Sequence, residues 1–150
     1  MTCTFFGHKD TPSEVRAALM SVLRQLITEE GVESFLVGNQ GGFDHYVLSA
    51  LRELEKEVPT IDYHVVLAYM PGKKQEYDTV DYRRTIYPEG IENVPRRFAI
   101  SWRNKWMLQR SDIVVTYITH SWGGAAQFAE QAVRQKKQII NLASALKEKT

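Results

Sequence analysis

The sequence is poor in cysteine, has no excess of one charge and has no long apolar run. A single cysteine, Cys3, excludes an internal disulfide and a cysteine-cluster zinc site, and it fits a reducing compartment. Nineteen Lys and Arg residues against 18 Asp and Glu give a formal net charge of +1, so bulk attraction is not expected to drive binding to nucleic acid or a membrane. The longest apolar run, Val65 to Met70, is too short for a membrane span. Because we also recognise no export signal, we expect a cytoplasmic protein without membrane contact.

What the sequence does contain is typical of one globular domain. The 150 residues are 43% apolar and 25% charged, which is enough for one hydrophobic core and leaves no case for disorder. Strand patterns and helical patterns alternate; we predict strands at 2–6, 34–37, 61–69, 112–118 and 138–142, and helices at 12–30, 45–58, 98–111 and 125–136. This alternation predicts a single α/β domain over 1–150, with helices on both faces of a mostly parallel sheet of about five strands.

Two stretches of the sequence lead to more specific expectations about structure. Thr11, Pro12 and Glu14 form a capping-box pattern, which predicts that Thr11 caps the first helix and that the helix begins at Pro12. Residues 70–95 are polar and aromatic without periodicity, so they are interpreted either as a lid over a pocket or as a subunit contact. After residue 142 we expect only a short charged tail.

Three loops with suggestive residues follow predicted strands. In an open parallel sheet, ligands bind at the carboxyl ends of the strands, and glycines there let the backbone approach a ligand. Free amide groups at a helix start also attract phosphate. Glycine also commonly follows strands in any α/β fold, so one such loop is weak evidence of function. Three such loops together favour a binding site. The predicted ligand-binding residues in them are Gly7, His8, Lys9, Asp10, Gly38, Asn39, Gln40, Gly41, Gly42, Asp44, Gly123, Gly124 and Ala125.

Arg103 is the most specific single candidate. It lies at the edge of the core-facing stripe of the 98–111 helix, where a guanidinium needs a partner. That partner is either a ligand phosphate or carboxylate, or a nearby Asp or Glu in a salt bridge. Asn104 points inward and is expected to tie loop backbone groups together. Trp102 and Trp106 are four residues apart and fit packing or an exposed interface better than base stacking.

Glu130 has two predicted roles that the sequence supports equally. Its carboxylate can contact a ribose or assist cleavage of a glycosidic bond, or it can form a surface pair with Arg134 four residues on. His8 and His120 fall in the candidate loops, but no histidine pair has metal-ligand spacing, so loop hydrogen bonding is the default for both. We therefore predict no metal site and no required cofactor.

Four segments resemble one known group of proteins. CTFFGHKDT from Cys3, GNQGGFD from Gly38, WRNKWMLQRSDIVV from Trp102 and WGGAAQFAEQA from Trp122 are similar to small bacterial members of the SLOG superfamily. That superfamily groups the DNA-processing protein Smf/DprA with the Lonely Guy enzymes. The resemblance implies a Rossmann-like fold, a nucleotide-type ligand and self-association as a homo-oligomer.

The Lonely Guy enzymes cleave the base from a nucleoside 5′-monophosphate, and the resemblance to them lies in two motifs. Their arginine, methionine and aspartate correspond to Arg103, Met107 and Asp112, with Asn104 in place of a lysine. Their glycine-rich loop and its glutamate correspond to Gly123, Gly124 and Glu130, with Trp122 in place of a proline and Ala126 in place of a further glycine. If the chain is an enzyme, this implies that Arg103 and Glu130 are its catalytic residues.

Three functions follow as alternatives. The first is binding of a nucleotide or nucleotide-derived small molecule at the carboxyl edge, with Arg103, Asn104 and Glu130 joining the loops. The second is a nucleotide N-glycosidase or deoxyribosyltransferase. The third is an interaction protein for single-stranded nucleic acid that uses Arg83, Arg84, Arg96, Arg97, Arg110 and nearby aromatics; the near-zero net charge argues against nucleic acid as a partner.

Overall fold

The computed structural model describes residues 1–70 and 82–148. The described residues contain six strands: β1 (Thr2–Gly7), β2 (Ser34–Val37), β3 (Asp62–Val66), β4 (Thr85–Ile86), β5 (Ile113–Tyr117) and β6 (Gln138–Asn141). Five α-helices accompany them: α1 (Val15–Thr28), α2 (Gly41–Glu57), α3 (Ala99–Gln109), α4 (Gly124–Arg134) and α5 (Leu142–Glu148). Short 3-10 turns occupy Tyr82–Arg84, Ile91–Asn93 and Arg96–Phe98.

The strands form one parallel sheet in the order β4-β3-β2-β1-β5-β6. The chain builds outward from β1 to β4, then crosses to the other side of β1 to add β5 and β6. The strand order therefore reverses between β1 and β5, where Gly7 lies opposite Tyr117. In an open α/β sheet, the crevice for a ligand forms outside the carboxyl ends of the strands at such a reversal.

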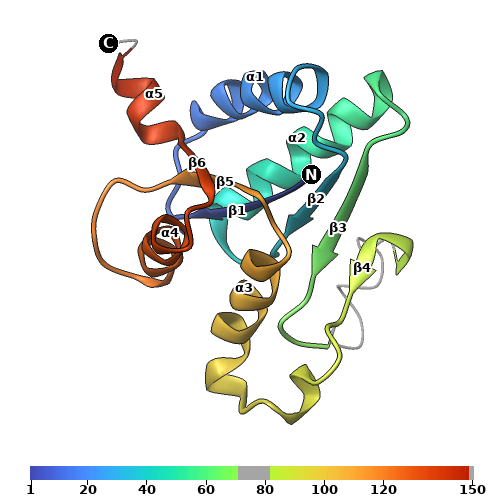
Figure 1. The fold of residues 1–150 in the computed structure, drawn as a ribbon, viewed down its shortest axis with the longest axis vertical. Coiled ribbons are helices and arrows are strands. Elements are labelled where there is room, and N and C mark those ends of the chain that lie inside the picture. Colours follow the sequence, from blue (N-terminus) through green and yellow to red (C-terminus); the bar gives the residue numbers. More distant parts are fainter. Residues whose placement is uncertain (71–81, 149–150) are drawn as a thin grey trace.

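Helices cover both faces of the sheet, which confirms the predicted three-layer α/β sandwich. Figure 1 shows α1 and α2 on one side and α3 and α4 on the other. On the first side, Leu19 and Leu23 of α1 and Leu51 of α2 pack on Phe5 and Phe35 of the sheet. On the other side, the core contains Phe6, Met107, Leu108, Val114 and Phe128. Burying these rings and branched chains on both faces is the main stabilising term for the sheet.

Several predicted boundaries are wrong. The sheet has six strands rather than about five, because β4 lies within the stretch that showed no periodicity. The first helix begins at Val15 rather than Pro12, and Thr11 does not cap it, because the Thr11 hydroxyl donates to the His8 carbonyl (2.6 Å). The predicted charged tail is the helix α5, which docks through Leu142.

The glycine loop after β2 is shorter than predicted, because α2 already begins at Gly41. Predictions for residues 70–95 fall partly outside the described residues, since 71–81 are not described. No helix within 1–70 or 82–148 is long and apolar enough to cross a membrane.

Candidate functional site

The three predicted loops meet at the carboxyl edge of the sheet. The Gly42 N–H donates to the Lys9 carbonyl (2.8 Å), which joins the loop after β1 to the start of α2. The Thr119 N–H donates to Nε2 of His8 (2.9 Å), which joins the loop after β1 to the loop after β5. Contacts between distant segments, in one case 111 residues apart, therefore assemble one surface at the reversal of strand order.

An aromatic column stands at this reversal. The His8 and His120 rings stack with centroids 3.7 Å apart, and His120 stacks on Trp122 at 3.8 Å, with interplanar angles of 13° and 17°. His8 is buried, whereas Trp122 is 69% exposed and is the outermost ring. One face of the indole rests on His120, so its other face is open to a planar ligand. Aromatic faces held in this way provide stacking platforms for nucleic-acid bases.

The base of the column is uncharged at neutral pH. The pKa of His8 is lowered from its ordinary value, first by burial and then by the neighbouring His120. Because Nε2 of His8 accepts the Thr119 N–H, the ring proton belongs on Nδ1. The column is therefore held by stacking and one backbone hydrogen bond, without ionic contacts of its own.

Five of the six glycines of the predicted site divide into two groups, and the sixth, Gly41, has a φ of +89°. An added Cβ would collide with Phe43 at Gly7, with Asp44 and Arg103 at Gly38, and with the Lys9 carbonyl at Gly42. These three glycines are thus required by internal packing. At Gly123 and Gly124 an added Cβ would meet nothing within 4 Å. The open backbone that a ligand needs is therefore found after β5, beside Trp122.

The first turn of α4 offers free donors at this open position. Gly123, with φ +95°, precedes the helix, and no side chain caps it. The first helical hydrogen bond runs from the Gln127 N–H to the Gly123 carbonyl. The amide groups of Gly124, Ala125 and Ala126 accordingly have no acceptor within the described part of the chain. Such a helix start attracts an anion through its N–H groups and the helix dipole.

Arg103 and Asp44 form a second, buried group above the ends of β2 and β3. Only 2% of Arg103 is exposed. Its Nη1 donates to the Val66 carbonyl (2.9 Å) and its Nε to Oδ1 of Asn104 (2.8 Å), while Asp44 accepts the Gln40 N–H (3.0 Å). The guanidinium and the carboxylate both lie close to Gly38. A Cβ at this position would collide with both groups. The group of Arg103, Asp44 and Asn104 therefore holds the chain segments that follow β2 and β3 from inside, as a buried brace.

This arrangement bears on two predicted roles. Arg103 has partners, as expected, but they are groups of the protein itself, the Val66 carbonyl and Asn104. A ligand contact by Arg103 therefore stays a prediction. Asn104 holds the Arg103 side chain through its Oδ1 and so contributes to the same brace.

Burial makes Asp44 a pH-sensitive part of this brace. The pKa of Asp44 is raised from 3.8 to about 6, because burial outweighs the opposing effects of Arg103 and of the Gln40 N–H. A carboxyl whose pKa is raised in the folded state contributes stability that is full below pH 3.8 and lost as the pH rises through about 6.

We therefore expect the wild type to lose about 2 to 3 kcal/mol relative to Asp44→Asn between pH 4 and pH 7. Urea unfolding of both proteins at four pH values measures this difference. His8 titrates in both proteins, so its effect cancels. A difference that stays constant with pH would contradict the expectation.

The other predicted site residues lie at or near the surface. Lys9, Asp10 and Asn39 are exposed at the carboxyl edge. Glu130 is exposed on α4, where its Oε1 accepts from Arg134 at 2.7 Å, the surface pair that was one of its two readings. Its predicted contact with ribose stays a prediction.

Two features of the edge were not predicted from the sequence. The exposed tryptophan is Trp122, whereas Trp102 and Trp106, expected to be exposed contacts, are half-buried. The predicted arginine set is also divided. Arg96 and Arg97 lie at the carboxyl edge just before α3, over the rings of Tyr69 and Phe98 (4.5 and 4.8 Å).

Two further arginines of that set, Arg110 and Arg84, lie elsewhere, and Arg83 is exposed just before Arg84. Arg110 stacks on Trp106 at the far end of α3 (3.9 Å). Arg84 lies over Tyr63 and pairs with Glu55. These contacts are at the opposite edge of the sheet from the aromatic column.

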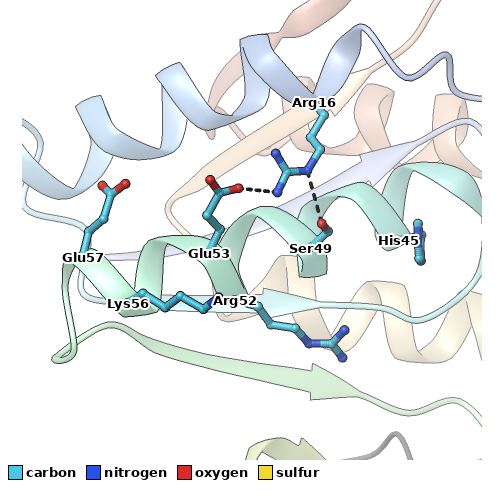
Figure 2. Close-up of a pocket in the computed structure, with 7 residues that line it drawn as sticks. All are labelled: Arg16, His45, Ser49, Arg52, Glu53, Lys56 and Glu57. Atoms are coloured by element: carbon cyan, nitrogen blue, oxygen red, sulfur yellow. Dashed lines mark hydrogen bonds and ion pairs between the residues drawn. The ribbon is translucent and has the colours of Figure 1, made fainter.

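A shallow groove of about 610 Å³ lies away from the strand ends, along α1 and α2. Figure 2 shows its side chains, with Arg16 turned toward Ser49 and Glu53. Nε of Arg16 donates to Ser49 (3.2 Å), and its Nη2 pairs with Glu53 (2.5 Å). Acids and bases alternate along this groove, and pairs of this kind on the surface contribute little net attraction for a charged ligand.

Comparisons with known proteins agree with the fold. The model of the YspA SLOG family (YpsA) matches residues 2–146. The structure of DNA processing protein A (DprA) from Streptococcus pneumoniae superposes with a TM-score of 0.64 at 12% identity, over 92% of this chain. DNA processing protein A from Helicobacter pylori, described for its single-stranded DNA binding mode, gives a TM-score of 0.56 at 15% identity, over 99% of this chain and 72% of its own. No curated protein matches.

The chain spans about half (48%) of the pneumococcal chain, so the likeness concerns one part of that protein. The Helicobacter pylori finding overturns the expectation that argued against nucleic acid as a partner. That expectation rested on net charge over the whole sequence. A net charge near zero does not measure the charge of one edge, and here Lys9, Arg96 and Arg97 are exposed at the same edge.

Proposed function

Because the chain belongs to the YspA SLOG family, whose model covers residues 2–146, we propose that it binds single-stranded nucleic acid at the carboxyl edge of its sheet. The observation that carries the proposal is the His8–His120–Trp122 column, with its open indole face beside the uncapped start of α4. A base stacks on Trp122 while its phosphate meets the amides after Gly123. This pairing of a stacking platform with an anion site suits an unpaired nucleotide, whose base faces are free.

The local charges support the same ligand. Lys9 follows the base of the column, and Arg96 and Arg97 are exposed where α3 begins. Each arginine lies over an aromatic ring, which holds a long side chain in place at the edge. Phosphates of a strand that crosses the edge would pass near these cations. The likeness to a fold that binds single-stranded DNA in Helicobacter pylori supports the proposal in the same direction.

The proposal predicts the effect of Trp122→Ala. Stacking on an aromatic side chain contributes about 1 to 3 kcal/mol per base, so the variant should bind ten-thymidine DNA roughly 5- to 160-fold more weakly. Fluorescence anisotropy of a labelled oligonucleotide measures the dissociation constant. Trp122→Phe keeps an aromatic face and should retain most of the affinity. Unchanged binding by Trp122→Ala would refute the stacking role, and absence of binding by the wild type would refute the function.

A nucleotide-derived small molecule is the second candidate, since one ring on Trp122 and one phosphate at α4 describe a mononucleotide equally well. Comparing thymidine 5′-monophosphate with ten-thymidine DNA separates the two candidates. Equal affinity per site favours the small molecule, and a large gain with length favours the strand. The glycosidase alternative is less favoured, because Glu130 is paired with Arg134 and Arg103 is buried.

A further inference from the structure

A second groove of about 350 Å³ lies between α3 and α4. Its α3 wall carries Phe98, Ser101, Trp102 and Lys105, and its α4 wall carries Gln127 and Gln131. Phe98 is 50% exposed, and Trp102 is half-buried beside Gly90. The groove therefore offers partly open aromatic rings together with amide side chains that can both donate and accept hydrogen bonds.

The charge of this groove has one sign. None of the described residues that line it is acidic, and Lys105 is exposed within it. The Arg97 guanidinium lies 4.8 Å from the Phe98 ring, at the same end of α3. The groove along α1 and α2 differs, because Glu53 and Glu57 line it beside its bases. Of these two grooves, the α3–α4 groove is therefore the one complementary to a polyanion.

The groove is continuous with the proposed nucleic-acid site. Gln127 lines the groove, and its backbone N–H bonds the Gly123 carbonyl, so it lies in the first turn of α4. At 1.5 Å per residue, Gln127 is about 4.5 Å along the helix from Gly124. A strand whose phosphate lies at the start of α4 thus reaches the groove with its neighbouring nucleotide.

We infer that the α3–α4 groove is a second nucleotide subsite for the same single strand. This inference rests on the proposed function and extends it from one base to two. The base of the neighbouring nucleotide contacts the Phe98 and Trp102 rings, and Lys105 neutralises the phosphate between the two nucleotides. Gln127 and Gln131 face the edge of this base. Hydrogen bonds from their amide groups to the base edge would discriminate among bases.

The test compares Lys105→Ala with Lys56→Ala, a matched exposed lysine on α2 at the opposite face of the sheet (Figure 2). Both variants and the wild type are titrated with thymidine 5′-monophosphate and with ten-thymidine DNA over a range of salt concentrations. For the DNA, Lys105→Ala should bind about 5-fold more weakly and should lower the salt slope by about 0.7, the value for one phosphate contact on a single strand. Its affinity for the monophosphate should equal that of the wild type, and Lys56→Ala should match the wild type with both ligands.

The outcomes distinguish the inference from the proposed function. If the wild type binds the DNA but Lys105→Ala and Lys56→Ala behave alike, the second subsite is wrong and the proposed function stands. If the wild type binds no oligonucleotide, the proposed function is wrong, and the second subsite is wrong with it. If Phe98→Ser lowers the mass of the protein in light scattering and leaves DNA binding unchanged, a second copy of the chain covers the groove and the inference is overturned.

Discussion

Replacing Gly7 by alanine should destabilise the protein by at least about 3 kcal/mol, as overpacking of a fully buried contact does in its severe cases. A Cβ at Gly7 would lie 2.7 Å from Cβ of Phe43 and closer still to two of its ring carbons. Phe43 is fully buried in the first turn of α2, between the sheet and the helix layer, so its ring has no open space into which to turn. Relief requires α2 to shift away from β1. Chemical denaturation at 25 °C measures the change in the free energy of unfolding.

Gly124→Ala is the matched control for Gly7→Ala. A Cβ there meets nothing within 4 Å, and the residue lies at the start of α4, so its stability should remain within about 0.5 kcal/mol of the wild type. Adding Phe43→Leu to Gly7→Ala should recover part of the loss, because leucine removes the ring that the new methyl group meets. If Gly7→Ala alone costs less than the control, the packing explanation for Gly7 is wrong.

This contrast shows what a glycine pattern in a sequence can and cannot predict. The glycines after three strands predict close approach of a ligand to the backbone, whereas the groups that lie close to Gly7 and Gly38 are Phe43, Asp44 and Arg103 of the protein itself. A missing side chain does not specify what fills its place, since the neighbour comes from a distant part of the chain. Only the structure separates these positions from the open ones at Gly123 and Gly124.

The architecture was largely predictable. Strands β1, β2, β5 and β6 lie within a residue or so of the predicted ranges, because runs of β-branched and aromatic residues between turn signals are specific for buried strands. The two-residue strand β4 is too short to produce a periodic pattern. Helix α5 was missed for a similar reason, since the few apolar residues that dock it do not outweigh its charged neighbours in the sequence.

The aromatic column was not predicted, because it depends on contacts across the chain. His8 and His120 were each placed in a candidate loop, yet nothing local indicates that their rings stack. Trp122 belongs to the third candidate loop and replaces a proline in a motif, but no role was predicted for its ring. An aromatic residue directly before two open glycines at the end of a buried strand is the signal that could have identified it.

Arg103→Leu should cost about 3 to 5 kcal/mol, the range found when the removal of one group leaves a buried charge uncompensated. Leucine replaces the apolar stem of the arginine but not its guanidinium. Asp44 then stays buried without its nearby cation, and the Val66 carbonyl loses its Nη1 donor. Burial also lowers the pKa of Arg103, while Asp44 acts to raise it, so each charge favours the ionised form of the other. Thermal and chemical denaturation at pH 7 measure the loss.

The control for Arg103→Leu is Arg52→Leu, an exposed arginine on the outer surface of α2 whose loss should change stability by less than about 0.5 kcal/mol. Adding Asp44→Asn to Arg103→Leu should recover part of the stability, because the remaining buried group is then neutral. If Arg103→Leu is as stable as Arg52→Leu, the guanidinium is not a structural brace, and its free donors would again be candidates for a ligand. If the loss is large and Asp44→Asn restores part of it, Arg103 acts from inside the protein by holding the chain segments that follow β2 and β3.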